Sequence, residues 1–340
     1  MIPIKNVYYM LSYAFKILNK QGYKKVATEK FENFADLCSA ILINGTSSLI
    51  KKGLAREYVL KTETTAAVKG KIDISSSIKE QSMIKRRLVC EYDEFSENSY
   101  MNRIIKTTML KLLHADIAKE RKNKLRKLLM YFANVDVLDV NLINWNVRID
   151  RNNQEYRMLI SICNLIINGL LQTQSDGKVK MMDFLDEQRM CRLYEKFLLE
   201  YYRKEHPEIR VSASQISWDT DDGYREMLPV MQSDIMLKKG EKTLVIDAKY
   251  YSHTTQKQYD VNTLHSGNLY QIFAYVKNLD TERTGNVSGM LLYAKTDEVV
   301  LPNNEYKMGG NAISVKTLDL DCDFSEIRKQ LDDIVAVYFN

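Results

Sequence analysis

The sequence predicts a multidomain chain of α+β and α/β class. A mixed α/β N-terminal region, residues 1–177, precedes a C-terminal domain, residues 178–340, in which helices flank a central mixed sheet. The 340 residues suffice for two or three domains, each with its own core. Helical and strand-like periodicities alternate along the chain, and the polar run Gln174-Ser175-Asp176-Gly177 is typical of a loop between domains.

The N-terminal region has helices at both ends and strands between them. Apolar residues repeat at helical spacing between residues 5 and 50. Residues 56–74 alternate apolar and polar side chains, which indicates a β-hairpin or a small barrel. Residues 98–129 and 156–171 again have helical periodicity. A basic cluster at residues 121–127 suits either a solvated helix face or contact with DNA or a protein partner.

The C-terminal domain alternates helices and strands in an order that places helices around a small mixed sheet. The expected helices are residues 183–204, 266–279 and 323–337, and the expected strands are residues 210–217, 230–238, 242–251, 286–294 and 311–317.

A candidate site lies at the end of one of these strands, where Asp247-Ala248-Lys249 follows the apolar run Leu244-Val245-Ile246. Strand side chains alternate between faces, so Asp247 and Lys249 project to the same side. If Lys238-Lys239-Gly240-Glu241 is a four-residue turn, Asp234 lies opposite Val245 and diagonal to Asp247, roughly 7–8 Å away on the same face. Two carboxylates and a lysine then converge.

This convergence suits the hydrolysis of phosphodiester bonds. Mg²⁺ prefers oxygen ligands, and Asp234, Asp247 and the Ala248 carbonyl can supply them; Mn²⁺ can replace it. A bound cation lowers the pKa of a water, and Lys249 can orient that water or stabilise developing negative charge. The alternative is a strand that ends in a surface Asp/Lys pair, with Asp234 as an ordinary hairpin residue.

Two helices next to the hairpin carry further candidates. Gln271 and Tyr275 lie four residues apart on one helix, hence on one face, where they can hold the lysine or a DNA phosphate; a half-exposed helix edge is the alternative. Glu195 on the helix before the hairpin is a possible additional metal ligand, or a solvated side chain beside Lys196. Glu200 on the same helix is a weaker candidate.

Composition excludes several other classes. The net charge of +5 permits a polyanionic partner without requiring one. Five scattered cysteines, without a Cys-x-x-Cys pair, suggest neither a disulfide framework nor a zinc site. The first residues predict an amphipathic helix and not a signal peptide, and no apolar stretch is long enough to span a bilayer, so we expect a cytoplasmic protein without membrane contact.

The motifs together resemble a known family. Asp234…Asp247-Ala248-Lys249-Tyr250-Tyr251, followed by Asn268-Leu269-Tyr270-Gln271 and Tyr275, resembles the PD-(D/E)xK nuclease superfamily, with its restriction-endonuclease-like fold. The closer resemblance is to the McrC family, the nuclease subunits of McrBC modified-cytosine restriction systems. The segments Asn6–Ala14, Val68–Ile72 and Asn102–Lys106 resemble further McrC motifs, so the likeness covers nearly the whole chain.

The resemblance implies a division of labour. McrC proteins act with McrB, a hexameric AAA+ GTPase that recognises modified cytosine in double-stranded DNA; the N-terminal part of McrC enters the ring and stimulates its GTPase, and the C-terminal domain cuts. The chain has no Gly-x-x-x-x-Gly-Lys-[Ser/Thr] loop, so GTP is expected on the partner. Residues 55–95 and 121–127 are candidates for the part that enters the ring.

Residue by residue, the resemblance assigns catalytic positions to Asp234, Asp247, Lys249 and Gln271, and Tyr275 and Lys257 are the expected DNA contacts. No proline directly precedes Asp234, and Asp247 stands where many relatives have Glu. Two alternatives stay open: a non-catalytic activator of the AAA+ partner, and a stand-alone exonuclease or resolvase.

Overall fold

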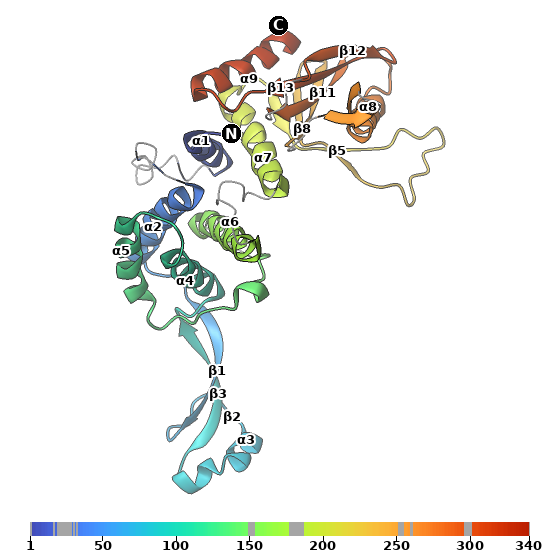
Figure 1. The fold of residues 1–340 in the computed structure, drawn as a ribbon. Coiled ribbons are helices and arrows are strands. Elements are labelled where there is room, and N and C mark those ends of the chain that lie inside the picture. The colour runs from blue at the N-terminus through green and yellow to red at the C-terminus, as the bar shows by residue number, and fades with distance from the viewer. Residues whose placement is uncertain are drawn as a thin grey trace. The chain divides into compact units, whose positions relative to one another are not determined.

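The protein divides into two compact units (Figure 1), seen in a computed structural model that describes residues 2–15, 18, 29, 31, 33–148, 154–176, 187–250, 255–258, 261–295 and 301–339. The sheet unit comprises Met1–Ala27 and Leu185–Asn340, and the helical unit comprises Thr28–Phe184. Two points differ from the expected division: the first residues of the chain belong to the sheet unit, and the second boundary falls after Phe184 and not after residue 177.

The sheet unit is built around six strands in the order β12-β13-β11-β8-β7-β4. β11 runs parallel to β8 and β13, whereas the β7–β8, β4–β7 and β12–β13 pairs are antiparallel, which confirms the predicted mixed sheet. The strands are β4 (Arg210–Ser212), β7 (Ile235–Lys239), β8 (Lys242–Lys249), β11 (Val287–Ala294), β12 (Asn304–Met308) and β13 (Asn311–Leu318).

Two small antiparallel pairs lie outside this sheet. They are β5 (Gln215–Ile216) with β6 (Met231–Gln232), and β9 (Thr255–Gln258) with β10 (Val261–Leu264). The expected strands 210–217 and 230–238 are therefore each divided in two. The division falls at a side-chain contact, since Ser233 Oγ donates to the Ser214 carbonyl at 3.1 Å.

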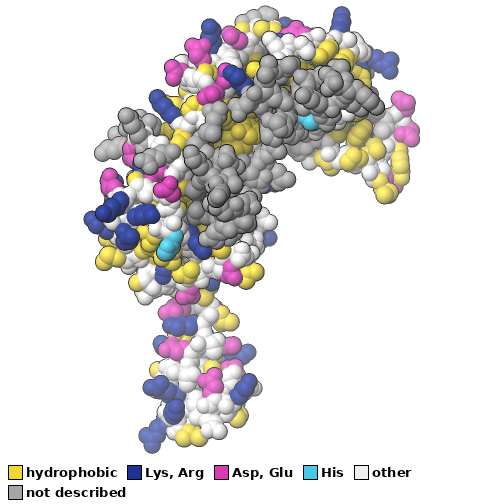
Figure 2. Space-filling model, viewed as in Figure 1, with side chains coloured by type: hydrophobic (Ala, Val, Ile, Leu, Met, Phe, Trp, Pro, Cys, Tyr) yellow, Lys and Arg dark blue, Asp and Glu magenta, His cyan; other side chains and the backbone are white. Residues whose placement is uncertain are grey.

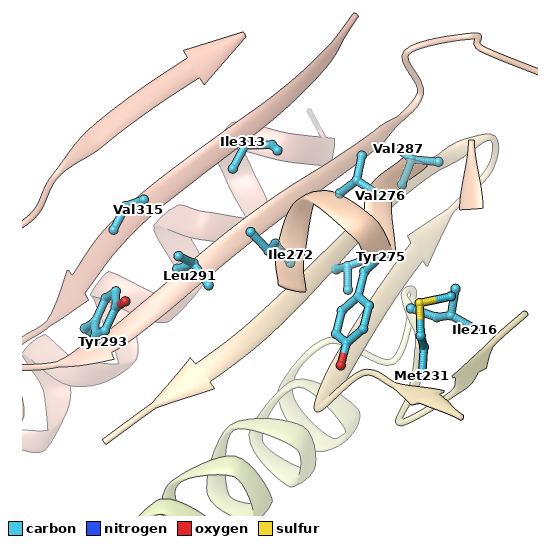
Figure 3. Packing of buried hydrophobic residues seen from close by; sticks show 11 residues of the cluster. Ile216, Met231, Ile272, Tyr275, Val276, Val287, Leu291, Tyr293, Ile313 and Val315 are labelled. Carbon is cyan, nitrogen blue, oxygen red and sulfur yellow. The ribbon is translucent and has the colours of Figure 1, made fainter. Parts of the chain in front are cut away.

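α8 (Ser266–Leu279) covers one face of the sheet. Its residues Ile272 and Val276 pack among buried side chains of β8, β11 and β13, as Figure 3 shows. A Cβ on Gly289 would lie 2.8 Å from a side-chain carbon of each, so glycine lets the helix approach β11 closely.

The other face is covered by α7 (Glu187–Glu205) and α9 (Phe324–Phe339). α1 (Ile4–Ala14) packs against α7. Asn6, 3% exposed, donates through Nδ2 to the carbonyls of Leu320 at 2.9 Å and Cys322 at 2.8 Å. The Tyr9 ring stacks on Phe324 with centroids 4.4 Å apart. These contacts place the N-terminal segment within the sheet unit.

The helical unit is a bundle from which a long β-ribbon extends (Figure 1). The bundle helices α2 (Phe34–Lys52), α4 (Tyr100–Leu113), α5 (Lys119–Leu129) and α6 (Gln154–Asp176) confirm the helical periodicities, and two 3₁₀ turns cover Met130–Phe132 and Val140–Leu142. Arg121 within the basic cluster is bound inside the unit, with Nη1 2.5 Å from Asp36 Oδ2.

The ribbon pairs β1 (Glu57–Thr65) with β3 (Leu88–Ser96), and its far end carries β2 (Lys71–Ile72), α3 (Ile74–Lys79) and a 3₁₀ turn at Ser82–Lys85. Gly70 has φ +59°, and a Cβ there would lie 2.4 Å from the Glu91 carbonyl, so only glycine fits. Apolar and basic side chains gather at this far end (Figure 2). Among the described residues, none of the helices is both long and apolar enough to span a membrane.

Candidate active site

The candidate site lies on the hairpin of β7 and β8. Lys239 pairs with Lys242, so the turn has two residues, Gly240-Glu241, and Gly240 takes φ +60°. The expected four-residue turn is therefore wrong, because β7 continues through Lys238 and Lys239, which pair with Thr243 and Lys242 of β8. Ile235 pairs with Ile246, and one further step along the strands places Asp234 beside Asp247 and not diagonal to it.

Asp234 and Asp247 form a buried pair of carboxyl groups. Asp247 is 1% exposed, and Asp234 Oδ2 accepts a hydrogen bond from the Ala248 amide at 2.9 Å. Burial raises the pKa of Asp247 to about 7, and burial likewise raises the pKa of Asp234. The two carboxyl groups influence each other, because the negative charge of Asp234 contributes to the raised pKa of Asp247. Two adjacent carboxylates with little access to water favour a shared proton, or a cation in its place.

Lys249 partly compensates this negative charge. Its Nζ lies 2.8 Å from Asp247 Oδ2, on the same face of β8, as the alternation of strand side chains predicts. Nζ also donates to Gln271 Oε1 at 3.2 Å, which fixes the lysine between β8 and α8. Of the two predicted uses of Gln271, the structure shows contact with the lysine.

A hydrogen-bonded chain continues from Gln271 into the protein. Gln271 Nε2 donates to the Tyr275 hydroxyl at 2.7 Å, and that hydroxyl donates to the Gln232 carbonyl at 3.0 Å. Tyr275 is 5% exposed, and Figure 3 shows its ring projecting from α8 among the core residues. In this arrangement the Tyr275 hydroxyl is buried and holds Gln271, and the expected contact between Tyr275 and DNA stays a prediction.

Glu195 approaches the site from α7. Its pKa is raised first by burial and then by the charge of Asp234, which places it within electrostatic reach of the pair. Cys191, one turn earlier, has its Sγ 3.1 Å from Glu195 Oε1 and 4.0 Å from the Ala248 carbonyl oxygen. Sequence reasoning missed Cys191, although its spacing of four residues from Glu195 was a usable signal.

Two further candidates are Glu200 and Lys257. Glu200 pairs with Arg203 on its own helix, with Oε1 2.7 Å from Arg203 Nη1. Lys257 belongs to β9, but its side chain lies outside the described residues.

The oxygen atoms of the pair fit a hard divalent cation. Asp247 Oδ2 is buried and accepts no hydrogen bond from the described residues, although it has the ion pair with Lys249. Together with Asp234 and the Ala248 carbonyl it offers the oxygen donors that Mg²⁺ prefers, and Mg²⁺ commonly takes one or two protein carboxylates and fills its other positions with water and phosphate. The described residues contain no preformed group of three or more His, Cys, Asp or Glu ligands.

Comparisons with known proteins identify the family. A family model described as "McrBC 5-methylcytosine restriction system component" matches residues 4–294. The type IV methyl-directed restriction enzyme EcoKMcrBC of Escherichia coli K12 is 30% identical over 343 residues, which cover 99% of this chain and 98% of the relative.

A solved structure shares the fold. It is a refined half-complex from a tetradecameric assembly of Thermococcus gammatolerans McrB AAA+ hexamers with bound McrC, and the match covers 98% of this chain and 76% of that one at a TM-score of 0.51 and 18% identity. The match extends over both units. By the family match and the E. coli relative, the chain belongs to the family of McrBC 5-methylcytosine restriction system components.

Proposed function

We propose that this chain is the metal-dependent DNA endonuclease subunit of a GTP-dependent restriction complex directed at modified cytosine, with a PD-(D/E)xK nuclease core in its sheet unit. One observation carries the proposal: Asp234, Asp247 and Lys249 meet on neighbouring strands, with Nζ 2.8 Å from Asp247 Oδ2. Burying two carboxylates beside a lysine contributes little to the stability of a fold, because the charges lose their water. The same arrangement suits phosphodiester hydrolysis by a bound cation.

Each residue has a part in this activity. Asp234, Asp247 and the Ala248 carbonyl would hold Mg²⁺, or Mn²⁺ in its place. When bound, the cation lowers the pKa of a water and offsets charge on the phosphate. Lys249 donates toward the attacking water or the developing oxyanion. Gln271 limits the positions that the ammonium can take, since its Oε1 accepts from Nζ at 3.2 Å.

The helical unit supplies a means of joining a ring-shaped partner. The far end of the ribbon exposes large apolar side chains: Val68 (60%), Ile74 (64%), Ile78 (63%), Met83 (56%) and Ile84 (79%). Exposed apolar groups at the end of a narrow projection are typical of an interaction site. The solved structure of similar fold contains McrB AAA+ hexamers with bound McrC. A McrB-like GTPase is accordingly the proposed partner: it binds GTP and recognises the modified base, and the ribbon enters its ring.

Asp247→Ala tests the nuclease assignment. Assembled with the GTPase, the variant should leave modified DNA uncut at every Mg²⁺ concentration while GTP hydrolysis by the complex stays at the wild-type rate. Asp333→Ala, which removes an exposed carboxylate from α9, is the control and should cut normally. Cleavage by Asp247→Ala at the wild-type rate would show that the chemistry resides elsewhere.

A further inference from the structure

We infer that Cys191 is a positioning residue of the metal site: its thiol holds the Glu195 carboxylate on the side of the Ala248 carbonyl and leaves that carbonyl open to a cation. This inference rests on the proposed function, because it assigns a partner to one candidate ligand of the same site.

The geometry gives the thiol one strong acceptor. Cys191 and Glu195 lie four residues apart on α7, so their side chains share a face of the helix. The thiol carries one proton, and its two neighbouring oxygens are unequal: Glu195 Oε1 at 3.1 Å and the Ala248 carbonyl at 4.0 Å. The proton therefore goes to the carboxylate.

Glu195 has two cations nearby, Arg192 and Lys249, but neither is committed to it. Arg192 is exposed, and Lys249 also serves Asp247 and Gln271. The thiol is the hydrogen-bond donor to Glu195 among the described contacts, and groups that orient a metal ligand in this way commonly change metal affinity by about 10–100-fold when they are removed.

The experiment measures Mn²⁺ binding to the full chain, by the loss of the free Mn²⁺ signal in electron paramagnetic resonance, without partner or DNA. Cys191→Ala should weaken binding about tenfold. Cys191→Ser should come within about threefold of wild type, because a hydroxyl also donates to a carboxylate. Cys322→Ala is the control, since it removes another half-buried thiol of the same unit, which contacts the Asp319 carbonyl; its Mn²⁺ affinity should equal that of wild type.

Three outcomes overturn the inference. The first is Cys191→Ala binding Mn²⁺ as tightly as wild type. The second is Cys191→Ser binding as weakly as Cys191→Ala, and the third is Cys322→Ala losing as much affinity as Cys191→Ala. Thermal unfolding of the metal-free variants identifies any that fail to fold, and cleavage assays of the complex provide a second readout: the Mg²⁺ concentration for half-maximal rate should rise in Cys191→Ala more than the maximal rate falls. If the wild-type protein neither binds Mn²⁺ nor cuts DNA, the proposed function itself fails. If the wild-type protein binds Mn²⁺ and cuts DNA, and the Cys191 variants do so equally well, only the inference about Cys191 fails.

Discussion

Lys249 Nζ lies 2.8 Å from Asp247 Oδ2, and the two residues are separated by one position of β8. Both side chains are largely enclosed, with exposed fractions of 13% and 2%. Gln271 Oε1 holds the lysine in this contact, and the Ala248 amide between the two residues donates to the neighbouring Asp234. The strand thus places a positive and a negative group on one side while the intervening Ala248 packs on the other.

Replacing Lys249 should separate metal binding from catalysis. Lys249→Met should lower the single-turnover cleavage rate by about 10²–10³-fold, because a donor to developing charge is lost. Mn²⁺ binding should be retained or become tighter, since a positive charge leaves the neighbourhood of Asp247. Lys242→Met, an exposed lysine at the start of the same strand, should change neither quantity. A Lys249→Met chain that cuts normally would remove the lysine from the mechanism.

The carboxyl pair predicts how the stability of the metal-free chain depends on pH. Burial raises the pKa of Asp247 from 3.8 to about 7, so between these values the folded chain binds more protons than the unfolded chain. The free energy of unfolding should therefore fall as pH rises from about 4 to about 7, and then level off. The raised pKa of Asp234 acts in the same direction.

Calorimetry at a series of pH values tests this. The melting temperature of the sheet unit should fall by roughly 5 °C across the window in wild type, and by less in Asp247→Asn, which carries no ionisable group there. Adding Mn²⁺ above pH 7 should raise the melting temperature of wild type and leave that of Asp247→Asn unchanged. An equal pH slope in the two proteins would contradict the assignment.

Tyr275 should act on cleavage through Gln271. Tyr275→Phe keeps the buried ring and removes the hydroxyl that accepts from Gln271 Nε2 and donates to the Gln232 carbonyl. We expect the maximal cleavage rate to fall about tenfold with little change in KM for DNA, because the amide loses its fixed orientation. Tyr270→Phe on the same helix removes a hydroxyl from a ring that is 70% exposed and should cut normally. A rise in KM alone would indicate a DNA contact instead.

Asn6 should stabilise the sheet unit from the other end of the chain. Asn6→Ala removes hydrogen bonds to the Leu320 and Cys322 carbonyls, and the loss should cost about 2–4 kcal/mol. The melting temperature of the sheet unit should fall, while that of the helical unit should not. Lys5→Ala, at an exposed neighbouring position, is the control. If the helical unit melted earlier instead, α1 would belong with that unit.

The end of the ribbon should determine binding to the partner. Ile84 is 79% exposed, and Ile84→Asp should weaken assembly with the GTPase at least tenfold, because a carboxylate would have to lose its water at the contact. Leu142→Asp provides a control of equal exposure, 79%, in the same unit. Size-exclusion chromatography of the mixed proteins and the stimulated GTP hydrolysis both report the effect. Equal assembly of the two variants would place the contact elsewhere on the helical unit.

The strength of local pattern explains which elements the sequence predicts. The apolar run that ends at Asp247 and the helical stripe of α8 are both strong, and the structure has both elements. β3 was not predicted, because Glu91, Asp93 and Glu94 interrupt the alternation of apolar and polar side chains. The strands β9, β10 and β12 were not predicted because they are mostly polar and have no clear alternation of this kind.

Parts of the site depend on information that local pattern lacks. The face that Asp247 and Lys249 share follows from the two-residue period of a strand, and it was predicted. The register of the hairpin was not, because Lys238 and Lys239 resemble turn residues although both are paired with the next strand. The burial of Tyr275 depends on β6, which approaches α8 from far along the chain. The contact of Asn6 with Cys322 spans 316 positions, and the sequence around Asn6 does not predict it.

The place of α1 in the sheet unit determines the order in which the chain can fold during synthesis. A ribosome makes residues 4–14 first, but their partners in α7 and around Leu320 emerge only after the whole helical unit. At about 5–20 residues per second, that delay is on the order of ten seconds or more. The ribbon and its bundle can therefore fold, and meet a partner, before the sheet unit is complete. Under the proposed function, a nascent chain would be able to assemble before it is able to cut DNA.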